Sequence, residues 1–312
     1  MDCSQFARAV QQNVSQVIIG KADVTELLLA ALLTEGHVLL EDVPGIGKTT
    51  LAKALARSLD CLFARIQFTP DLLPSDVTGI NYYNQKQQEF EFRPGPVLSQ
   101  VLLADEINRA TPRTQSSLLE AMQERQVTVD GQTYPLPRPF LVMATQNPIE
   151  LEGTFPLPEA QVDRFLMQLG LGYPSQDEEE EILLRYQRDD PLLQLRPVAS
   201  AAEVLELQRQ VKEVHVSADV RHYILQVVRA TRGHEAVDLG VSPRGSLALY
   251  KASQALAALR GRAYVIPSDV QYLCPPILTH RVHISPQIRL RGRTPQQVVT
   301  EITEAVPVPV VE

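Results

Sequence analysis

The sequence predicts an α/β fold with a parallel sheet, followed by a part made only of helices. Up to Gly172, short apolar runs alternate with helical stretches, which is the pattern of βαβ units. One run, Val101–Asp105, is apolar until its final acid, as expected for a parallel strand buried on both faces. After Gly172 the strand pattern stops and helical periodicity takes over.

Composition limits the class of protein. The chain has 312 residues, a formal net charge of −8, 44% hydrophobic and 21% charged residues, so we expect two folded domains rather than a disordered chain. The acidic balance argues against a large nucleic-acid footprint. The apolar run Leu27–Leu33 is far too short to span a bilayer, and the first ten residues lack a secretory signal. Three scattered cysteines fit a reducing compartment, so we expect a cytoplasmic protein.

The elements of the first part follow in order. Residues 5–35 are expected to form two helices, broken at Val17–Gly20. A turn, Asp42–Gly47, leads into a helix over 48–59. Each expected strand is a short apolar run that ends in polar or turn residues: 37–41, 62–68, 101–105, 139–145 and 165–169.

Two insertions are predicted to be hairpins. Within 71–96, alternating residues flank a polar tip, Asn84–Gln88. Within 126–137, Asp130-Gly131 lies between two alternating segments, which is a strong hairpin signal. Long insertions beside such a sheet are more often functional than structural.

The second part is expected to be a small helical domain. Ser175 and Glu178 form a capping box that starts a helix with an acidic first turn. A linker over 189–201 separates domains at 1–188 and 189–312. Four helices are expected near 202–213, 217–231, 243–260 and 267–279, and the tail Val306–Glu312 is expected to be extended.

The glycine-rich loop before the helix expected over 48–59 carries the strongest chemical signal. Its residues are Pro44, Gly45, Ile46, Gly47, Lys48, Thr49 and Thr50. Backbone N–H groups of such a loop converge on phosphate oxygens, Lys48 would contact the β- and γ-phosphates, and Thr49 would hold Mg²⁺. Asp42 stands where the general pattern has its first glycine, so its carboxylate is expected to point away or to pair. A tight turn with an ordinary lysine is the structural alternative.

An acidic pair follows the third expected strand. Asp105 would lie beside the Mg²⁺ site, and Glu106 would polarise an attacking water. A buried strand that ends in a solvated acidic pair is the alternative. A glutamate at this position favours hydrolysis over simple nucleotide storage.

With these motifs, the chain resembles the MoxR subfamily of the AAA+ ATPases, in the helix-2-insert clade. The blocks that carry the resemblance are EDVPGIGKTT (41–50), TPDLLPSDVTG (69–79), LLADEINRATPRTQSSLLEAMQERQVT (102–128), ATQNPIELEGTFPLPEAQVDRF (144–165) and SPRG (242–245). The resemblance implies an αβα nucleotide domain with a helical lid. It also implies that 71–96 is the helix-2 insert and 126–137 the pre-sensor-1 insert.

The same resemblance assigns further roles. Asn147 matches sensor 1, Arg164 the arginine finger given to the neighbouring subunit, and Arg244 sensor 2. Ile18, Ile19 and Gly20 match the segment beside the adenine. Each has a plainer alternative: a turn before Pro148, a local surface pair with Asp163, an exposed lid arginine and an ordinary buried turn. Arg109 is a weaker candidate for the subunit interface.

The remaining polar groups carry weaker signals. Arg289, Arg291 and Arg293 form a basic patch that fits an intersubunit or partner contact, just before a helix start at Thr294-Pro295. His280 and His283 lack the further ligands of a metal site. The resemblance implies a ring, typically a hexamer, that hydrolyses ATP with Mg²⁺ and matures partner proteins. Such proteins act with von Willebrand A domain partners, in some cases in metal-cofactor insertion. The alternatives are a DNA- or RNA-acting motor, a nucleotide-gated scaffold with little turnover, and a metal-chelatase subunit.

Overall fold

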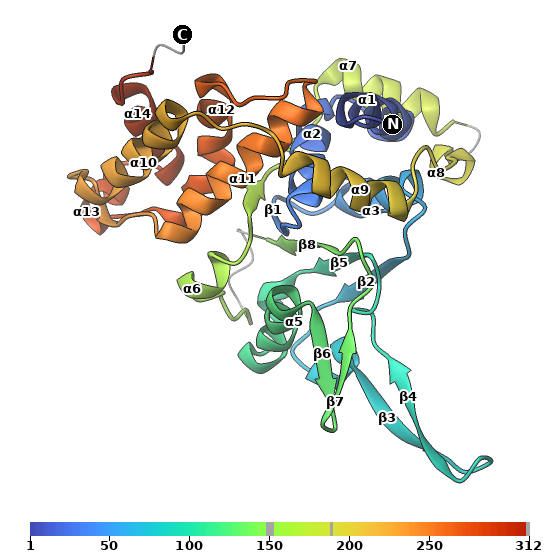
Figure 1. The fold of residues 1–312 in the computed structure, drawn as a ribbon. Helices are drawn as coiled ribbons and strands as arrows, with labels where there is room; N and C mark the ends of the chain where they lie inside the picture. Colours follow the sequence, from blue (N-terminus) through green and yellow to red (C-terminus); the bar gives the residue numbers. More distant parts are fainter. Residues whose placement is uncertain (148–152, 188–189, 310–312) are drawn as a thin grey trace.

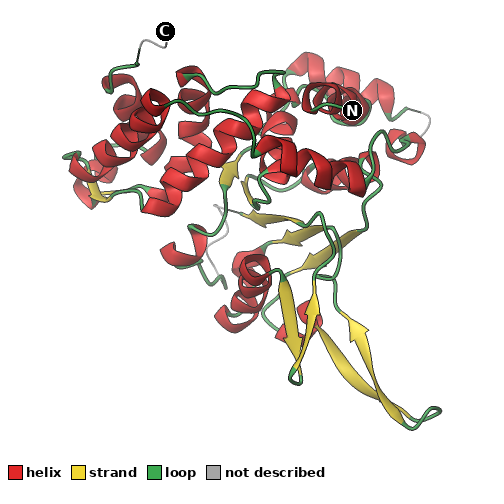
Figure 2. Ribbon diagram, in the orientation of Figure 1, coloured by secondary structure: helices red, strands yellow, loops and turns green. Residues whose placement is uncertain are grey.

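The computed structural model describes residues 1–147, 153–187 and 190–309. Most helices lie in one half of the molecule, and the strands lie in the other half together with a few helices (Figure 1, Figure 2). The central sheet has five strands: β1 (Val38–Glu41), β2 (Phe63–Gln67), β5 (Val101–Asp105), β8 (Leu141–Gln146) and β9 (Met167–Leu169). They lie in the order β2-β5-β8-β1-β9 and pair only in parallel. The five predicted strands and the α/β class are therefore confirmed.

Helices cover both faces of the sheet, as the alternation along β5 illustrates. Leu103 belongs to one cluster of buried residues, which also contains residues of α1 (Cys3–Ser15), α2 (Ala22–Leu33) and α3 (Lys48–Ser58). Leu102 and Ala104 belong to a second cluster, which contains residues of α5 (Pro112–Glu124). Since successive residues of a strand point to opposite faces, a fully apolar strand is what this three-layer arrangement requires. The predicted break between α1 and α2 falls where the structure has it.

Both predicted hairpins are present and lie together at one end of the molecule (Figure 1). α4 (Pro74–Thr78) leads into β3 (Gly79–Asn84) and β4 (Glu89–Pro94), while β6 (Gln126–Val129) pairs with β7 (Gln132–Pro135). The rings of Phe92 and Tyr134 stack with centroids 3.9 Å apart, and Asn81 donates to Asp130 over 2.9 Å. The two insertions therefore contact each other.

The helical part contains the four predicted helices and additional elements. Its helices are α7 (Gln176–Arg185), α8 (Pro191–Gln194), α9 (Ala201–Val211), α10 (Ala218–Gly233), α11 (Pro243–Leu259), α12 (Pro267–Leu278), α13 (Pro286–Leu290) and α14 (Pro295–Ala305). The short strands β10 (Val237–Leu239) and β11 (His283–Ile284) pair, and the 3₁₀ turn η2 (Thr279–Arg281) precedes β11. The helix predicted to start at Ser175 is therefore present as α7, and the four further predicted helices are α9 to α12. Helices α8 and α13 were not predicted, and α14 was indicated only by its start. Thr294 caps α14, whose buried residues Val298, Val299 and Ile302 complete the packing against α12.

The helical part packs directly against the first part. α11 contacts both α1 and α2, and one continuous cluster of buried residues joins them. The expected linker contains α8, and its far end donates backbone N–H groups from Val198 and Ala199 to the Ser58 carbonyl. The predicted boundary at 188–189 lies outside the described residues, so the division into two domains stays a prediction.

Candidate functional site

The glycine-rich loop connects β1 to α3, and its shape depends on two glycines. Gly45 and Gly47 have φ of 88° and 94°, in the left-handed region that favours glycine. A Cβ at either position would meet no atom within 4 Å, so backbone conformation and not crowding selects glycine here. Because Gly47 directly precedes α3, the free N–H groups of the first helical turn lie beside the loop.

Two adjoining cavities border this loop. The first has about 390 Å³ and is lined by Pro44, Gly45, Gly47, Lys48, Thr49, Thr50, Arg65, Gln67, Asp105, Glu106, Thr145 and Asn147. The second has about 510 Å³ and is lined by Val17, Ile18, Ile19, Lys21, Pro44, Gly45, Ile46, Gly47, Thr50, Tyr173, Pro174, Glu179, Ile182 and Tyr186. They share Pro44, Gly45, Gly47 and Thr50, so the loop forms the wall between a polar cavity and a more apolar one.

The polar cavity brings together the predicted loop, acidic pair and sensor residue. Thr145, at the end of β8, donates from its hydroxyl to Asp105 over 2.6 Å and accepts from the Glu106 backbone N–H over 2.8 Å. Glu106 has φ of 55°, an uncommon value for a residue without a glycine's freedom. One threonine thus fixes the carboxylate of one acid and the backbone of the other.

Two arginines and a glutamine donate hydrogen bonds to the acidic pair. The Arg65 guanidinium donates to Asp105 over 2.6 Å, while Gln67 and Arg109 donate to Glu106 over 2.7 and 3.0 Å. The sequence analysis missed Arg65, Gln67 and Thr145. Arg65 and Gln67 are two residues apart on β2, the strand next to β5, so they lie on the same face of the sheet. This spacing was the sequence signal that could have identified them.

The loop is also held by its own chain. The Lys48 ammonium donates to the backbone carbonyls of Asp42 and Val43 over 2.8 and 3.2 Å. The Asp42 carboxylate accepts from the backbone N–H of Leu171, and of Gly172 over 3.2 Å. The expectation that Asp42 pairs away from the loop is confirmed, and the pair ties the loop to the segment after β9.

Helix α7 forms one wall of the apolar cavity. Tyr173 and Pro174 precede it, and Glu179, Ile182 and Tyr186 face the predicted Ile18 and Ile19. Gly20 does not line this cavity; the Glu178 side chain lies against it, where any Cβ would collide. The α7 wall was missed because helical periodicity does not show which face of an acidic helix closes a cavity.

The two predicted arginines lie away from both cavities. Arg164 follows α6 (Glu159–Val162), is half-buried and makes no side-chain hydrogen bond or ion pair to another described residue. Arg244 begins α11 and lies 3.7 Å from the Asp163 carboxylate. Neither belongs to the residues that line either cavity within the described chain. Arg164 and Arg244 are therefore not placed to contact a molecule that is bound in either cavity of their own chain.

Asp163 connects the lid to the segment that carries Arg164. It accepts from Arg281 Nε over 2.7 Å and from the Ser242 hydroxyl over 3.2 Å. Arg281, whose side chain is 3% exposed, also donates to the carbonyls of Asp163, Phe165, Leu166 and Ile277. Burial lowers the pKa of Arg281, and the Asp163 charge opposes that shift. His280 stays neutral because burial and Arg281 hold its pKa well below the usual value.

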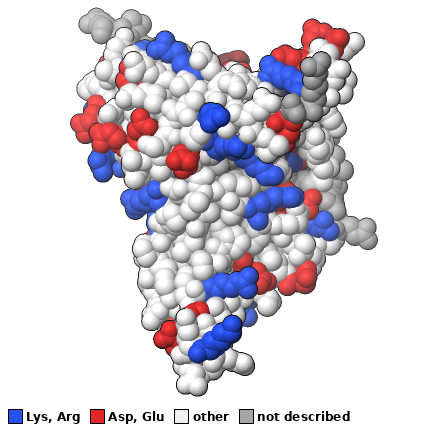
Figure 3. Space-filling model, turned by 90° about the vertical axis from the view of Figure 1, so that its right-hand side faces the viewer, with Lys and Arg blue, Asp and Glu red and all other residues white. Residues whose placement is uncertain are grey.

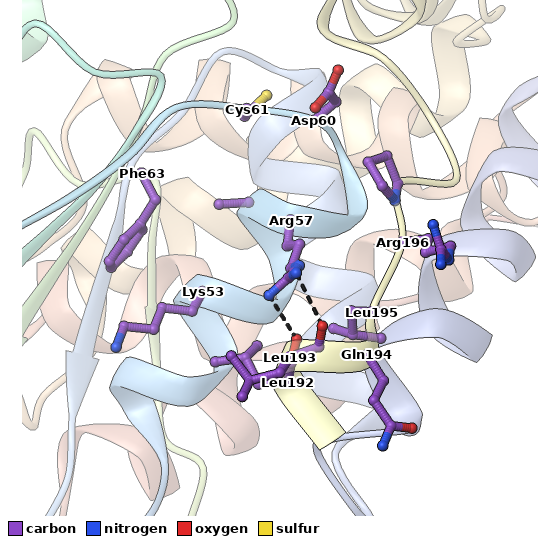
Figure 4. A pocket seen from close by; sticks show the side chains of 12 residues that line it. Lys53, Arg57, Asp60, Cys61, Phe63, Leu192, Leu193, Gln194, Leu195 and Arg196 are labelled. Carbon is purple, nitrogen blue, oxygen red and sulfur yellow. Dashed lines mark hydrogen bonds between the residues drawn. The ribbon is translucent and has the colours of Figure 1, made fainter. Parts of the chain in front are cut away.

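A larger cavity, of about 730 Å³, lies at the other end of α3. Lys53, Arg57, Cys61 and Phe63 form one side of it, and residues 192–197 of the linker form the other. Arg57 donates to the carbonyls of Leu192 and Leu193 over 3.0 Å each (Figure 4). Burial raises the pKa of Cys61 to about 12, so its thiol is unreactive. This cavity therefore lies where the linker packs against α3, and it holds no reactive thiol among the described residues.

Comparisons with known proteins agree with this geometry. Residues 37–167 match the model for the ATPase family associated with various cellular activities, and residues 229–302 match the AAA lid domain. Chaperone MoxR1 of Mycobacterium tuberculosis is 44% identical, over 95% of this chain and 81% of its own length. The chain belongs to the MoxR-type AAA+ ATPases. Its lid match covers α11 to most of α14, which confirms the predicted helical lid.

Other MoxR-type relatives and a solved structure extend the agreement. The uncharacterized Bacillus subtilis protein YeaC is 54% identical, over 96% of this chain and 93% of its own length. Protein MoxR of Paracoccus denitrificans is 34% identical, over 89% of each chain. A Cytophaga hutchinsonii protein provisionally classed as an ATPase superposes with a TM-score of 0.92 at 39% identity, over 99% of this chain and 97% of its own.

The structure also bears on the other predicted features. Within the described residues, no group of histidine, cysteine and acidic side chains could hold a metal ion, and no helix is long and apolar enough to cross a membrane. His283 lies 3.1 Å from Glu159, and Arg293 pairs with Glu301. Figure 3 shows Lys and Arg in small groups with acidic groups beside them on the face it presents. The part of the predicted tail at 310–312 and Pro148 lie outside the described residues.

Proposed function

We propose that this MoxR-type protein binds ATP with Mg²⁺, hydrolyses it in a ring of identical subunits, and uses the energy to remodel or mature partner proteins. The observation that carries the proposal is the polar cavity. It joins the loop residues Lys48 and Thr49, the acidic pair and Asn147 at the carboxyl end of one parallel sheet. That edge is where ligands bind in open α/β sheets.

Each residue would have a defined task. The backbone N–H groups of the loop and of the first turn of α3 bind the phosphates, and Lys48 leaves its two carbonyl partners to contact the β- and γ-phosphates. The Thr49 hydroxyl and the Asp105 carboxylate are the oxygen ligands that Mg²⁺ prefers, and they line the same cavity. Bound Mg²⁺ would neutralise charge on the phosphate oxygens.

Glu106 would accept the proton of the attacking water, and Asn147 would orient that water. In the structure Gln67 and Arg109 both donate to one oxygen of Glu106, Oε2, so the attacking water would donate to the other oxygen, Oε1. The apolar cavity, with Ile18 and Ile19 facing Ile182 and Tyr186, would take the adenine ring. Glu179 at its edge can accept from the exocyclic amine of the base.

The position of Arg164 supports the proposed ring. Because Arg164 lines neither cavity of its own chain, it would act as an arginine finger on the nucleotide of the next subunit, with Arg244 beside it. Such a finger contributes about 10³–10⁵ in rate. We propose a hexamer on the resemblance to the family.

The substrate class is proposed from the relatives and from charge. A relative with 44% identity is named a chaperone, which supports a protein client over a scaffold. The von Willebrand A domain partner is proposed on the resemblance to the family alone. Maturation of enzymes, with metal-cofactor insertion as one form, would be the task. The exposed hairpin is poorly suited to nucleic acid, because its tip at 84–88 carries one lysine and the second hairpin turns at Asp130. A cytoplasmic site of action is proposed because three scattered cysteines fit a reducing compartment.

The experiment that tests the client class is ATP-dependent capture with Glu106→Gln as bait. This variant should bind ATP and stall, so a client accumulates on it. Recovery of one defined protein with ATP, absent with ADP and absent with Lys48→Ala, supports remodelling. Recovery of nucleic acid that is lost at high salt would instead support a DNA- or RNA-acting motor.

A further inference from the structure

Helix α7 has two faces with different partners. Counted at 100° per residue, Glu178, Glu179, Ile182, Arg185 and Tyr186 share one side. Glu179, Ile182 and Tyr186 line the apolar cavity, and the Glu178 side chain lies against Gly20. Arg185 donates to the Ser15 carbonyl. The inner face of α7 is therefore fully used by its own chain.

The outer face of α7 exposes leucines among acids. Asp177, Glu180, Leu183 and Leu184 lie on the opposite arc, and we call them the α7 stripe. Leu183 and Leu184 are 74% and 64% exposed. Asp177 and Glu180 are exposed and have no side-chain hydrogen bond or ion pair to any other residue that the structure describes. Adjacent exposed leucines on a charged helix are typical of an interaction surface.

A second stripe with the opposite charge lies on α11. Arg244, Leu247 and Lys251 follow one another at helical spacing on its outer side, and we call them the α11 stripe. Leu247 is 60% exposed and Lys251 is exposed, with no ion pair of its own among residues 1–147, 153–187 and 190–309. Both stripes therefore combine exposed leucine with charge, acidic on α7 and basic on α11.

Each stripe adjoins one half of the proposed active site. α7 walls the apolar cavity beside the phosphate-binding loop, so the α7 stripe marks the nucleotide side of the molecule. The α11 stripe begins at Arg244, which lies 3.7 Å from Asp163, and Asp163 directly precedes Arg164. Figure 1 shows α7 at the upper right and α6 with the start of α11 at the left, so the two half-sites lie on opposite sides of the chain.

We propose that the α7 stripe of one copy docks on the α11 stripe of the next copy. Acid meets base, the leucines pack together, and the contact brings Arg164 of one copy to the nucleotide side of its neighbour. A contact between two different surfaces is heterologous, so it repeats from copy to copy and can close into a ring. The inference rests on the proposed function because it names the surfaces that assemble its shared site.

The test uses two variants that each break one stripe. Variant X carries Leu183→Asp and Leu184→Asp, and variant Y carries Leu247→Asp and Lys251→Asp. All four side chains are exposed, so folding should be unaffected, which circular dichroism and thermal unfolding check. Leu290→Asp is the matched control, because Leu290 is 89% exposed beside Arg289 and Arg291 but lies in neither stripe.

Particle mass is measured with a non-hydrolysable ATP analogue. The parent and Leu290→Asp should form rings, whereas X and Y alone should stay at the 34.7 kDa of one chain. Mixed in equal amounts, X and Y retain one intact contact, formed by α7 of Y and α11 of X. They should therefore form pairs of one X and one Y that grow no further.

ATP hydrolysis then reports the direction of the contact. X and Y alone should fall to the level of Arg164→Ala, about 10³-fold below the parent. The X–Y pair should recover up to half of the parent rate per chain. Glu106→Gln should remove the recovered rate only when Y carries it, and Arg164→Ala only when X carries it.

Three outcomes would overturn the interface: rings formed by X or Y alone, loss of rings in Leu290→Asp with X and Y unaffected, or no assembly of the parent in any nucleotide state. A parent that forms rings through the two stripes but does not hydrolyse ATP would refute the proposed function and leave the interface standing. The two failures are therefore distinguishable.

Discussion

Replacing Asp163 by alanine should destabilise the protein more than the loss of any surface ion pair. The change leaves the Arg281 guanidinium, with a side chain 3% exposed, without its counter-charge. Removing one partner of a buried pair costs about 3–5 kcal/mol. Because four backbone carbonyls still accept from Arg281, we expect the lower end, about 3 kcal/mol.

The assay is urea unfolding followed by circular dichroism. Asp163→Asn keeps an acceptor for Nε without the charge, so it should lose about half as much stability. The control is Glu206→Ala, which breaks an ion pair with Arg209 whose side chains are 55% and 76% exposed. Exposed pairs contribute about 0–1 kcal/mol. If Asp163→Ala loses no more stability than Glu206→Ala, the clamp between the lid and the Arg164 segment does not exist.

Three further predictions concern single residues. His37 accepts from the Val142 N–H and contacts the Met122 carbonyl, and burial lowers its pKa to about 3. The free energy of unfolding should therefore fall as pH drops from about 6.5 toward 3, by up to about 1.4 kcal/mol per pH unit. Urea midpoints at pH 7 and pH 5 measure this fall, and the part of it that His37 causes should be absent in His37→Gln. Thr145→Val should lower kcat about 10–100-fold, because Asp105 and the Glu106 backbone lose the hydroxyl that hydrogen-bonds to both. Nucleotide affinity in a fluorescent-nucleotide titration should stay nearly unchanged, and Thr145→Ser should recover kcat. A kcat equal to that of the parent would contradict this prediction. Arg65→Gln should lower the Mg²⁺ concentration for half-maximal nucleotide binding about two- to fivefold, because Mg²⁺ then no longer has to displace the half-exposed Arg65 guanidinium from Asp105. An unchanged or higher Mg²⁺ requirement would show that Arg65 and Mg²⁺ do not compete for Asp105.

The sheet and the loop could be predicted because their signals are local. A fully apolar run such as Val101–Asp105 has few alternatives to a buried parallel strand, and Gly45 and Gly47 adopt the backbone that their residue type allows. The hairpin turn at Asp130-Gly131 followed from the same kind of local rule, with φ of 50° and 81°.

Interactions between distant segments could not be predicted. Asp163 and Arg281 are 118 positions apart, and nothing near either residue indicates the pair. The α7 wall of the apolar cavity was hidden because both faces of that helix carry polar and apolar residues. Helix α14 was indicated only by its Thr294-Pro295 start, and the strands β10 and β11 are too short to show periodicity. The direction of Arg244 depends on how the lid packs, which no local pattern encodes.

The most direct test of the central claim measures ATP hydrolysis and ATP binding on the same preparations of parent and Glu106→Gln protein. The account predicts Mg²⁺-dependent hydrolysis by the parent and nucleotide binding by both proteins. It predicts that hydrolysis in Glu106→Gln falls by about 10²-fold or more. Hydrolysis at the parental rate in Glu106→Gln would remove this cavity as the site of catalysis, and a parent that neither binds nor hydrolyses ATP would contradict the proposed function as a whole.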